Sequence, residues 1–378
     1  MSIMQSIKRP ATVVLGMVMF IATGVHAQTD APTPRTTPAD ATPADTTTTA
    51  PAAPTSAVTF ATLEDAIAAI NRPGTTLTPE QITEAERSIS AATQAGEAPH
   101  RVKYAQSLLA ARQNDFRQAR DLMREVVKLE PDNAIYRMTH AGHAFNSISI
   151  AGALDKLSLA EEGRDAYLEA LRIDATLIQP RLVLAEYYIQ APGIAGGSWK
   201  KAGEQAQSLI DLPDGRGEFL GYIMKARIAM ERERWKEMSE NFTLAETARG
   251  ESASAFVAII SHANALLDKK EDAKAALAQV QRAMPLAPEG DSTALSVLGR
   301  CKQELKDWQG AADAFAQVLA QEPDARLSRL GYAASLEKLG RQAEALQQYR
   351  EFTNRFPEGA QAEKAYAAIA RLNRAGVR

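Results

Sequence analysis

A fixed spacing of 34 residues organises the C-terminal part of this 378-residue chain. Three positions recur at this spacing, as Ala311, Phe315 and Pro323 in one segment and as Ala345, Tyr349 and Pro357 in the next. From Thr62 onward the chain is rich in Ala, Leu, Glu, Gln and Arg, which favour helices, and has almost no β-branched runs. A period of this length accommodates two helices, so it predicts a series of antiparallel helix pairs.

One unit, residues 292–325, shows the physical basis of the pattern. Its first predicted helix carries Gly299, where the missing side chain lets the second helix approach closely. Asp307 and Trp308 lie at the turn, and Pro323 ends the second helix because proline lacks a backbone donor. The second helix places three apolar residues on one face at spacings of four and three: Ala311, Phe315 and Val318.

Other segments have the same outline. The predicted buried faces of their second helices are Ala119, Met123 and Val126 in residues 100–133, Ala273, Leu277 and Val280 in residues 254–287, and Ala345, Tyr349 and Phe352 in residues 326–359. Less regular units include Tyr167 and Ala170, the segment 183–214, and Phe242 with Ala245. Residues 358–374 are predicted to form a terminal helix that covers the last repeat, because an end unit needs a polar outer face.

This pattern resembles the tetratricopeptide-repeat superfamily over about residues 98–375. The resemblance implies an all-α fold, an α-solenoid of antiparallel helix pairs that coils into a right-handed superhelix. We therefore expect a helical repeat domain with a C-terminal capping helix over residues 98–376, preceded by an N-terminal helix pair over residues 58–97.

Members of that superfamily are typically protein-binding scaffolds whose first helices line a concave groove. The resemblance implies these groove candidates: Arg101, Tyr104 and Leu108, then Ala258, His262 and Ala265, then Ser296, Arg300 and Gln303, then Leu330, Ala334 and Glu337. The carboxylate-clamp version of the family has Lys, Arg and Asn at several of these places. This chain departs from it, so the sequence does not favour recognition of an acidic C-terminal peptide.

The N-terminus has the order of a secretory signal peptide. Lys8 and Arg9 precede an apolar run from Ala11 to about Ala22, and small residues surround Ala27. We expect cleavage after Ala27, removing residues 1–27, because the apolar run is shorter than the roughly 20 residues that span a bilayer. No Cys follows the run, so lipoprotein processing is not expected. The expected location is the periplasm.

Residues 28–57 form a second non-globular segment, in which 24 of 30 positions are Thr, Pro or Ala. Such a composition cannot bury enough apolar area to offset the entropy of ordering. The segment is predicted to be a disordered, extended linker, and the sequence leaves open whether it is a tether, a glycosylated stalk or a functionless tail.

Charge and cysteine content exclude several classes of function. Removal of residues 1–27 takes away Lys8 and Arg9, so the formal net charge falls from −3 to −5, which disfavours nucleic-acid binding. No later segment is apolar and long enough to span a membrane. Cys301 is the sole cysteine, so an intramolecular disulfide and a multi-thiolate metal site are both impossible. We expect it to be buried as a small apolar residue.

A Gly-rich insert, residues 191–202, interrupts the regular spacing and precedes a helix. Gly196, Gly197, the capping residue Ser198 and nearby Lys200 could hold an anion through backbone amides and the helix dipole. The spacing of a phosphate-binding loop is absent. The alternative is a lengthened turn between helices, in which glycine supplies a positive φ.

No set of residues indicates catalysis. His140 and His143 lie three apart on a predicted helix, but no third metal ligand is evident, and the adjacent acidic pairs project to different sides of their helices. We therefore predict no enzymatic activity, cofactor or metal. The leading hypothesis is a periplasmic scaffold that binds a protein partner through its groove. The alternative is a component of an envelope transport or polymer system that binds a small ligand or glycan.

Overall fold

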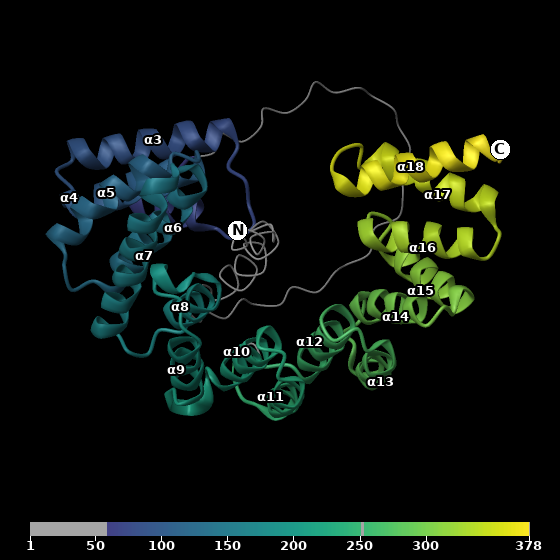
Figure 1. Ribbon diagram of the computed structural model, residues 1–378. Coiled ribbons are helices and arrows are strands. Elements are labelled where there is room, and N and C mark those ends of the chain that lie inside the picture. Colours follow the sequence, from purple (N-terminus) through teal and green to yellow (C-terminus); the bar gives the residue numbers. More distant parts are fainter. Residues whose placement is uncertain (1–58, 251–252, 378) are drawn as a thin grey trace, which may run out of the picture. The chain divides into compact units, whose positions relative to one another are not determined.

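The computed structural model describes residues 59–250 and 253–377, and all regular structure in these ranges is helical (Figure 1). The predicted signal peptide and linker, residues 1–57, lie outside the described residues. The chain divides into two compact units, one ending at Leu184 and the other beginning at Ala185. The boundary falls inside helix α8 (Gln179–Gln190), and each unit is described by itself.

The first unit contains three helix pairs before α8. Their helices are α2 (Leu63–Asn71), α3 (Pro79–Gln94), α4 (Pro99–Arg112), α5 (Phe116–Leu129), α6 (Ala134–Ser147) and α7 (Ala153–Ile173). Thr62 and Thr78 begin α2 and α3 as capping boxes, in which the threonine side chain accepts from the backbone three residues later and the side chain there accepts from the threonine amide. A 3₁₀ turn, Ile148–Ile150, joins α6 to α7.

The second unit contains the remaining pairs and a final helix. Its helices after α8 are α9 (Trp199–Ile210), α10 (Glu218–Glu231), α11 (Trp235–Thr247), α12 (Ala255–Asp268), α13 (Ala273–Ala283), α14 (Thr293–Glu304), α15 (Trp308–Gln321), α16 (Arg326–Lys338), α17 (Gln342–Arg355) and α18 (Ala360–Arg374). Three 3₁₀ turns, η2 to η4, occur at Gly193–Ala195, Pro213–Gly215 and Met284–Leu286.

The turn inside a pair has a recurring conformation. One residue with positive φ precedes the residue that caps the second helix, and these positive-φ residues are Asn114, Glu233, Glu271, Lys306 and Gly340. In most of these turns the next backbone amide donates to the carbonyl five residues earlier, as Asp307 does to Lys302 at 2.8 Å. Asp307 then accepts from the amide of Gly310 at 2.9 Å, so the turn predicted from the sequence is confirmed.

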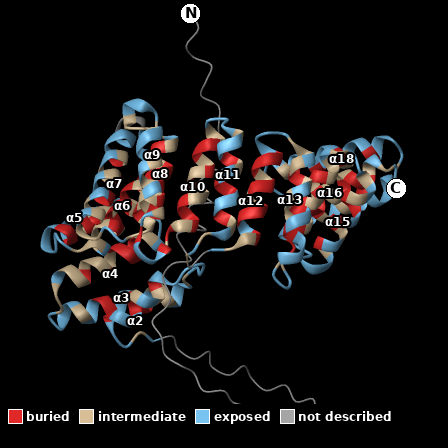
Figure 2. Ribbon diagram, turned by 90° about the horizontal axis from the view of Figure 1, so that it is seen from below, coloured by how far each residue is buried: buried red, intermediate tan, exposed pale blue. Residues whose placement is uncertain are grey.

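The core lies between the paired helices, whose facing sides carry the buried residues (Figure 2). The predicted second-helix faces are buried in α5, α15 and α17, and Phe315 is among the largest fully buried side chains. A β-carbon on Gly299 would stand 2.6 Å from Cε1 of Phe315, so the predicted close approach of the helices is present. Gly331 of α16 meets the other edge of the same ring at an equivalent 2.6 Å.

The predicted face of α13 is wrong by three residues. Its buried residues are Ala276, Val280 and Ala283, whereas Ala273 and Leu277 are only partly buried. The turn before α13 is longer than the other turns of this conformation, because the amide of Asp272 donates to Leu266, six residues earlier rather than five. One added residue shifts the start of α13 by one position, so it accounts for only part of the difference.

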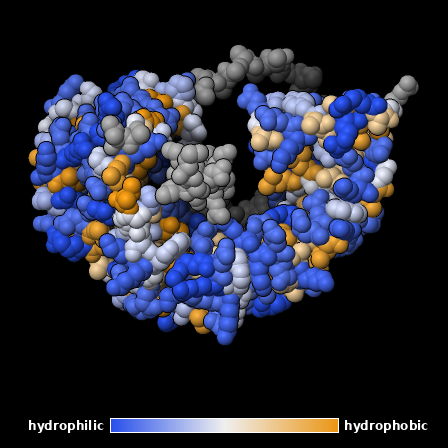
Figure 3. All heavy atoms as spheres, in the orientation of Figure 1, coloured by the Kyte–Doolittle hydropathy of each residue, from blue (hydrophilic) through white to orange (hydrophobic). Residues whose placement is uncertain are grey.

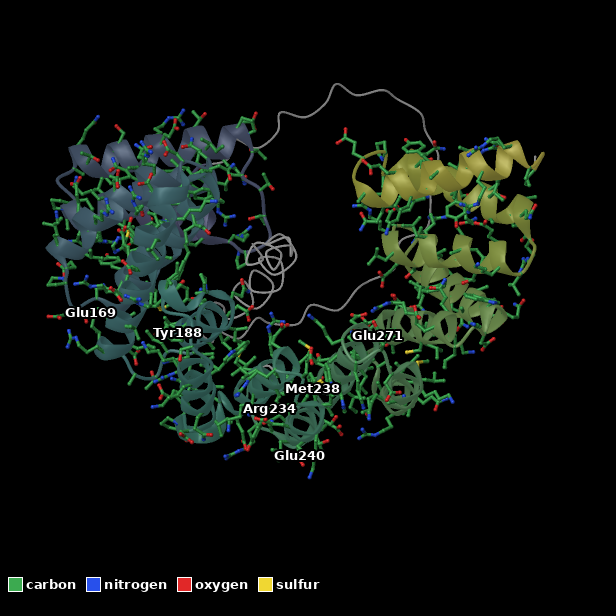
Figure 4. The ribbon with its side chains drawn as sticks, in the orientation of Figure 1. Glu169, Tyr188, Arg234, Met238, Glu240 and Glu271 are labelled. Atoms are coloured by element: carbon green, nitrogen blue, oxygen red, sulfur yellow. The ribbon has the colours of Figure 1, made fainter. Side chains whose placement is uncertain are left out.

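The two sides of a second helix differ in burial, as α11 shows. On α11, Met238 is fully buried, whereas Glu240, two residues later, projects away from the stack (Figure 4). Pairs of this kind follow from the helical repeat, which turns residues two apart toward opposite sides. Glu240 lies 3.7 Å from Lys236 on the exposed side of α11. The first helices carry the residues considered next.

Candidate partner-binding surface

In the second unit, polar side chains connect the first helix of each pair to the first helix of the next. The bonded pairs are Glu186 of α8 with Arg227 of α10, Glu231 of α10 with Lys269 after α12, Asn264 and Asp268 of α12 with Arg300 of α14, Gln303 of α14 with Ser335 of α16, and Glu337 of α16 with Arg371 of α18. We call this series the first-helix row. It runs through the whole of the second unit.

The pair of Glu186 and Arg227 is the least exposed ion pair in the row. Arg227 donates from Nε and Nη2 to the two carboxylate oxygens of Glu186 at 3.0 and 2.9 Å. Glu186 is buried, and Gln190 also donates to it. A bidentate contact with little water around it is stronger than an exposed ion pair, so this contact fixes α10 against the end of α8.

Two sequence-predicted candidates hold the middle of the row. Arg300 donates from Nη1 to Oδ1 of Asn264 at 2.9 Å and pairs with Asp268. Gln303 contacts α16, on the other side of α14. It donates to the carbonyl of Gly331 at 2.9 Å and to Oγ of Ser335 at 3.0 Å. Together they join α14 to both neighbouring first helices, so the two side chains already have partners within the stack.

Ser296 and Glu337 also lie in contacts between helices. The hydroxyls of Ser296 and Ser328 are 3.2 Å apart. Glu337 accepts from Nη2 of Arg371 at 2.7 and 2.9 Å and from the hydroxyl of Tyr349 at 3.2 Å. Burial, together with the Glu337 carboxylate, raises the pKa of Tyr349 to about 12, so this phenol stays protonated and keeps donating.

His262 does not line a groove. It is 4 % exposed, its ring stacks on Phe242 at 5.1 Å, and Nε2 lies 3.0 Å from Oγ of Ser239. Burial lowers its pKa to about 4, so the imidazole is neutral. Ala258 and Ala265, predicted beside it, are buried too.

The three candidates in the first unit are used in packing. Arg101 of α4 pairs with Glu64 of α2 and with Glu97, and the latter contact is 2.9 Å. Tyr104 meets the ring of Tyr136 at 4.9 Å between centroids, and Leu108 is buried in the same part of the core. These residues hold α4 against its neighbours in the first unit.

The sequence interpretation missed Leu327, which lies in the first turn of α16. It is 65 % exposed, and Leu330 and Ala334 continue the same helix face at spacings of three and four with partial exposure. We call these three residues the α16 strip. Figure 3 shows a small apolar area over the start of α16 on a largely hydrophilic face. The spacing of Leu327 to the predicted candidate Leu330 would have identified it.

The Gly-rich insert forms a closed turn between α8 and α9. Ser198 caps α9 by accepting from the amide of Lys201 at 3.3 Å. The amides of Gly196, Gly197 and Ser198 donate to Gly193, Pro192 and Tyr188, at 3.0, 3.1 and 2.9 Å. The Lys200 side chain is exposed and lies 3.8 Å from Glu204. Since three loop amides have chain partners, this conformation leaves them no capacity for an anion.

A polar cluster in the first unit surrounds Glu162 of α7. Arg124 of α5 donates to both of its oxygens at 2.7 Å, and Nε2 of His140 on α6 lies 2.8 Å from Oε1. Burial opposes ionisation of Glu162, but these hydrogen bonds outweigh it and lower the pKa to about 2. His143 is buried nearby, with its pKa lowered to about 4 by burial and by His140. The cluster therefore ties three consecutive helices together.

The remaining candidate sites for metal binding, thiol chemistry or ligand binding do not form a functional site. Within the described ranges, no group of three or more His, Cys, Asp or Glu is placed to hold a metal ion. Cys301 is fully buried in the core, which raises its pKa to about 11. Two surface depressions, of about 410 and 380 Å³, are each lined by one helix, the first by α17 and the second by α5 with its cap Asp115. Depressions of that kind do not enclose a small ligand.

Comparisons with known proteins identify the repeats. The family model for the tetratricopeptide repeat matches residues 294–325 and 328–359, the α14–α15 and α16–α17 pairs. Comparison with curated protein sequences gives no match. In the described part of the chain, no helix combines the length and apolarity needed to cross a membrane.

Three of the solved structures similar to this chain are two tetratricopeptide-repeat proteins and a pilus biogenesis factor. A tetratricopeptide repeat protein from Parabacteroides merdae is 13 % identical, with a TM-score of 0.46, and the match covers 72 % of this chain and 98 % of that one. PilW, a widely conserved type IV pilus biogenesis factor, is 12 % identical, with a TM-score of 0.40 and coverage of 71 % and 98 %. YrrB, a TPR protein with an unusual peptide-binding site, is 18 % identical, with a TM-score of 0.32 and coverage of 65 % and 97 %.

Proposed function

The chain is a tetratricopeptide-repeat protein, and from that premise we propose that it is a non-catalytic scaffold that binds a partner protein through the first helices of its second unit. The proposed contact surface is the α16 strip, Leu327, Leu330 and Ala334, with Arg300, Gln303 and Glu337 of the first-helix row as its polar surroundings. The N-terminal signal pattern supports export, and we propose the periplasm as the location.

The single observation that carries this proposal is the exposure of Leu327. Exposed large apolar residues are normal when scattered, but this one continues into two further residues of the same helix face. Protein interfaces combine a small apolar centre, which supplies most of the binding energy, with a polar rim that excludes water. The α16 strip and the adjacent row have that arrangement.

The first-helix row supports the proposal in a second way. Side chains that are already paired lose little conformational entropy when a partner binds, because their rotamers are fixed beforehand. Arg300 and Glu337 still expose part of their side chains, so at the rim Arg300 can donate and Glu337 can accept a further hydrogen bond. A surface fixed in this way favours binding without rearrangement of the first helices.

The test is affinity capture from periplasmic extract with the chain from Gln28 onward, its Leu327→Asp variant and a control variant, Leu286→Asp. Leu286 is also exposed and lies in the same unit, but it is on the turn after α13. We expect one specific protein that is captured by the wild type and the control and lost with Leu327→Asp. Once that protein is purified, its dissociation constant from Leu327→Asp should be about tenfold or more higher than from the wild type. Equal capture by all three forms would remove the α16 strip from the proposal.

A further inference from the structure

The loop between α8 and α9 displays the most exposed of the large apolar residues in the described ranges. Ile194 lies in the 3₁₀ turn Gly193–Ala195 and is 89 % exposed. Tyr188, labelled in Figure 4, marks the part of α8 from which this loop departs. Because nearly all of the isoleucine side chain faces solvent, it contributes no packing to the fold.

The conformation of the loop is held by several contacts. Tyr187 donates from its hydroxyl to the carbonyl of Ala195, and the amide of Ser198 donates to Tyr188 at 2.9 Å. Gly196 has a φ of 85°, and a β-carbon on Gly197 would overlap the carbonyl oxygen of Ala191. These contacts hold the loop in one conformation, with Ile194 at its tip.

Cationic and aromatic residues follow this tip in the sequence. Residues 191–202 contain Lys200 and Lys201 and no Asp or Glu. Lys200 exposes 88 % of its side chain, with Glu204 3.8 Å away as its acidic neighbour. Trp199 is 40 % exposed, and the guanidinium of Arg232 lies 6.0 Å from its ring centre. The segment thus combines an apolar tip, an amphipathic aromatic side chain and net positive charge.

We propose that this loop is a membrane-contact site, at which Ile194 enters the headgroup region of an anionic lipid surface while Lys200 and Lys201 attract the lipid phosphates. Tryptophan and lysine are the residues that favour the boundary between lipid and water. A protruding tip suits a flat lipid surface, whereas a peptide ligand requires a groove. The proposal is independent of the partner-binding function, because it uses neither the α16 strip nor the first-helix row.

The expected association is weak and reversible. One large aliphatic side chain that leaves water contributes about tenfold to the partition coefficient, and each basic residue near an anionic surface contributes about fivefold. These contributions are far below that of a spanning helix. The loop would hold the protein near the lipid surface without anchoring it, and salt would weaken the association because the basic contribution is screened.

The test is co-sedimentation of the chain from Gln28 onward with vesicles of phosphatidylglycerol and phosphatidylethanolamine, compared with vesicles of phosphatidylcholine alone. Four forms are compared: wild type, Ile194→Ser, Lys200→Glu and the control Leu286→Ser, which removes a different exposed apolar residue of the same unit. Thermal melts of all four forms check that the fold is intact.

We expect the wild type and the control to bind the anionic vesicles equally, Ile194→Ser to bind about tenfold more weakly, and Lys200→Glu to bind severalfold more weakly. Binding should decrease at high salt and be absent with phosphatidylcholine. Equal binding by Ile194→Ser and wild type, or no binding by any form, would overturn the proposal. So would an effect of Ile194→Ser on capture of a protein but not on vesicle binding, which would make the loop a protein-contact site.

Discussion

The ring of Phe315 occupies the space beside Gly299 so closely that a β-carbon on the glycine would stand 2.6 Å from Cε1. Gly331 stands in the same relation to the opposite edge of the ring. One aromatic side chain of α15 is therefore held between glycines of α14 and α16, the first helices of two successive pairs. The spacing of those helices, and with it the position of the α16 strip, depends on this contact.

Gly299→Ala should destabilise the second unit by about 1–3 kcal/mol, because the added methyl group overpacks a closely packed site. Gly331→Ala should have a similar effect. The measurement is the midpoint of urea unfolding followed by circular dichroism.

Gly203→Ala is the matched control. Gly203 lies within α9, and a β-carbon there would meet nothing within 4 Å. This change should stabilise the protein by roughly 0.5–1 kcal/mol, since alanine favours a helix over glycine. If Gly299→Ala raised the midpoint as the control does, the close approach of the two helices would be refuted.

The sequence predicted the helix pairs because their period reflects packing that is repeated in each unit. Ala311, Phe315 and Val318 are buried as their spacing indicates, and Gly299 has the expected role. Each of these inferences needs only the helical repeat and the length of the turn. Leu327 could have been found by the same reasoning, through its spacing to Leu330.

Features that depend on a change in turn length or on distances between pairs were not predictable. The turn before α13 is one residue longer than the turns of the same conformation in other pairs, and no residue type in that turn predicts the added residue. The first-helix row joins residues that are about 30 to 40 positions apart, such as Asn264 and Arg300. Which of many polar side chains meet across that distance depends on the packing of whole helices.

The register of α13 can be tested with two similar substitutions. Ala276→Leu should destabilise the protein by about 1–3 kcal/mol, because Ala276 is fully buried. Ala273→Leu should cost less than about 1 kcal/mol, because Ala273 is only partly buried. Thermal melts of both variants decide the matter, and a larger loss from Ala273→Leu would restore the register expected from the 34-residue spacing.

Acidification should destabilise the fold well above the pH at which carboxylates titrate. Burial lowers the pKa of His143 and His262 to about 4, against 6.5 for an exposed histidine. Between these values the unfolded chain binds more protons than the folded chain, so stability falls as the pH decreases from 6.5 to 4. Each histidine can contribute up to about 3 kcal/mol to this loss. The measurement is the urea midpoint at pH values from 7.5 to 4.5.

His262→Gln provides the control for this pH dependence. The variant loses packing at every pH, but the slope of stability against pH should be smaller because one titrating group is gone. An unchanged slope in His262→Gln would show that this histidine is not the source.

Cys301 should resist thiol reagents in the folded protein. The side chain is fully buried, and burial raises its pKa to about 11, so at pH 8 roughly 100-fold less thiolate is present than for an exposed cysteine. Reaction with a chromogenic disulfide reagent should be at least about 100-fold slower in buffer than in 8 M urea. Comparable rates under the two conditions would mean that the α14 face carrying Cys301 opens readily.

The contact of Glu186 with Arg227 should be the strongest ion pair of the first-helix row. A double-mutant cycle with Glu186→Gln and Arg227→Met should give a coupling energy of about 1–2 kcal/mol, because the carboxylate is buried and the contact is bidentate. The pair of Lys236 and Glu240, at 3.7 Å with both side chains exposed, should give less than about 0.5 kcal/mol in the same cycle. Equal coupling in the two cycles would show that the row does not stabilise the spacing of α8 and α10.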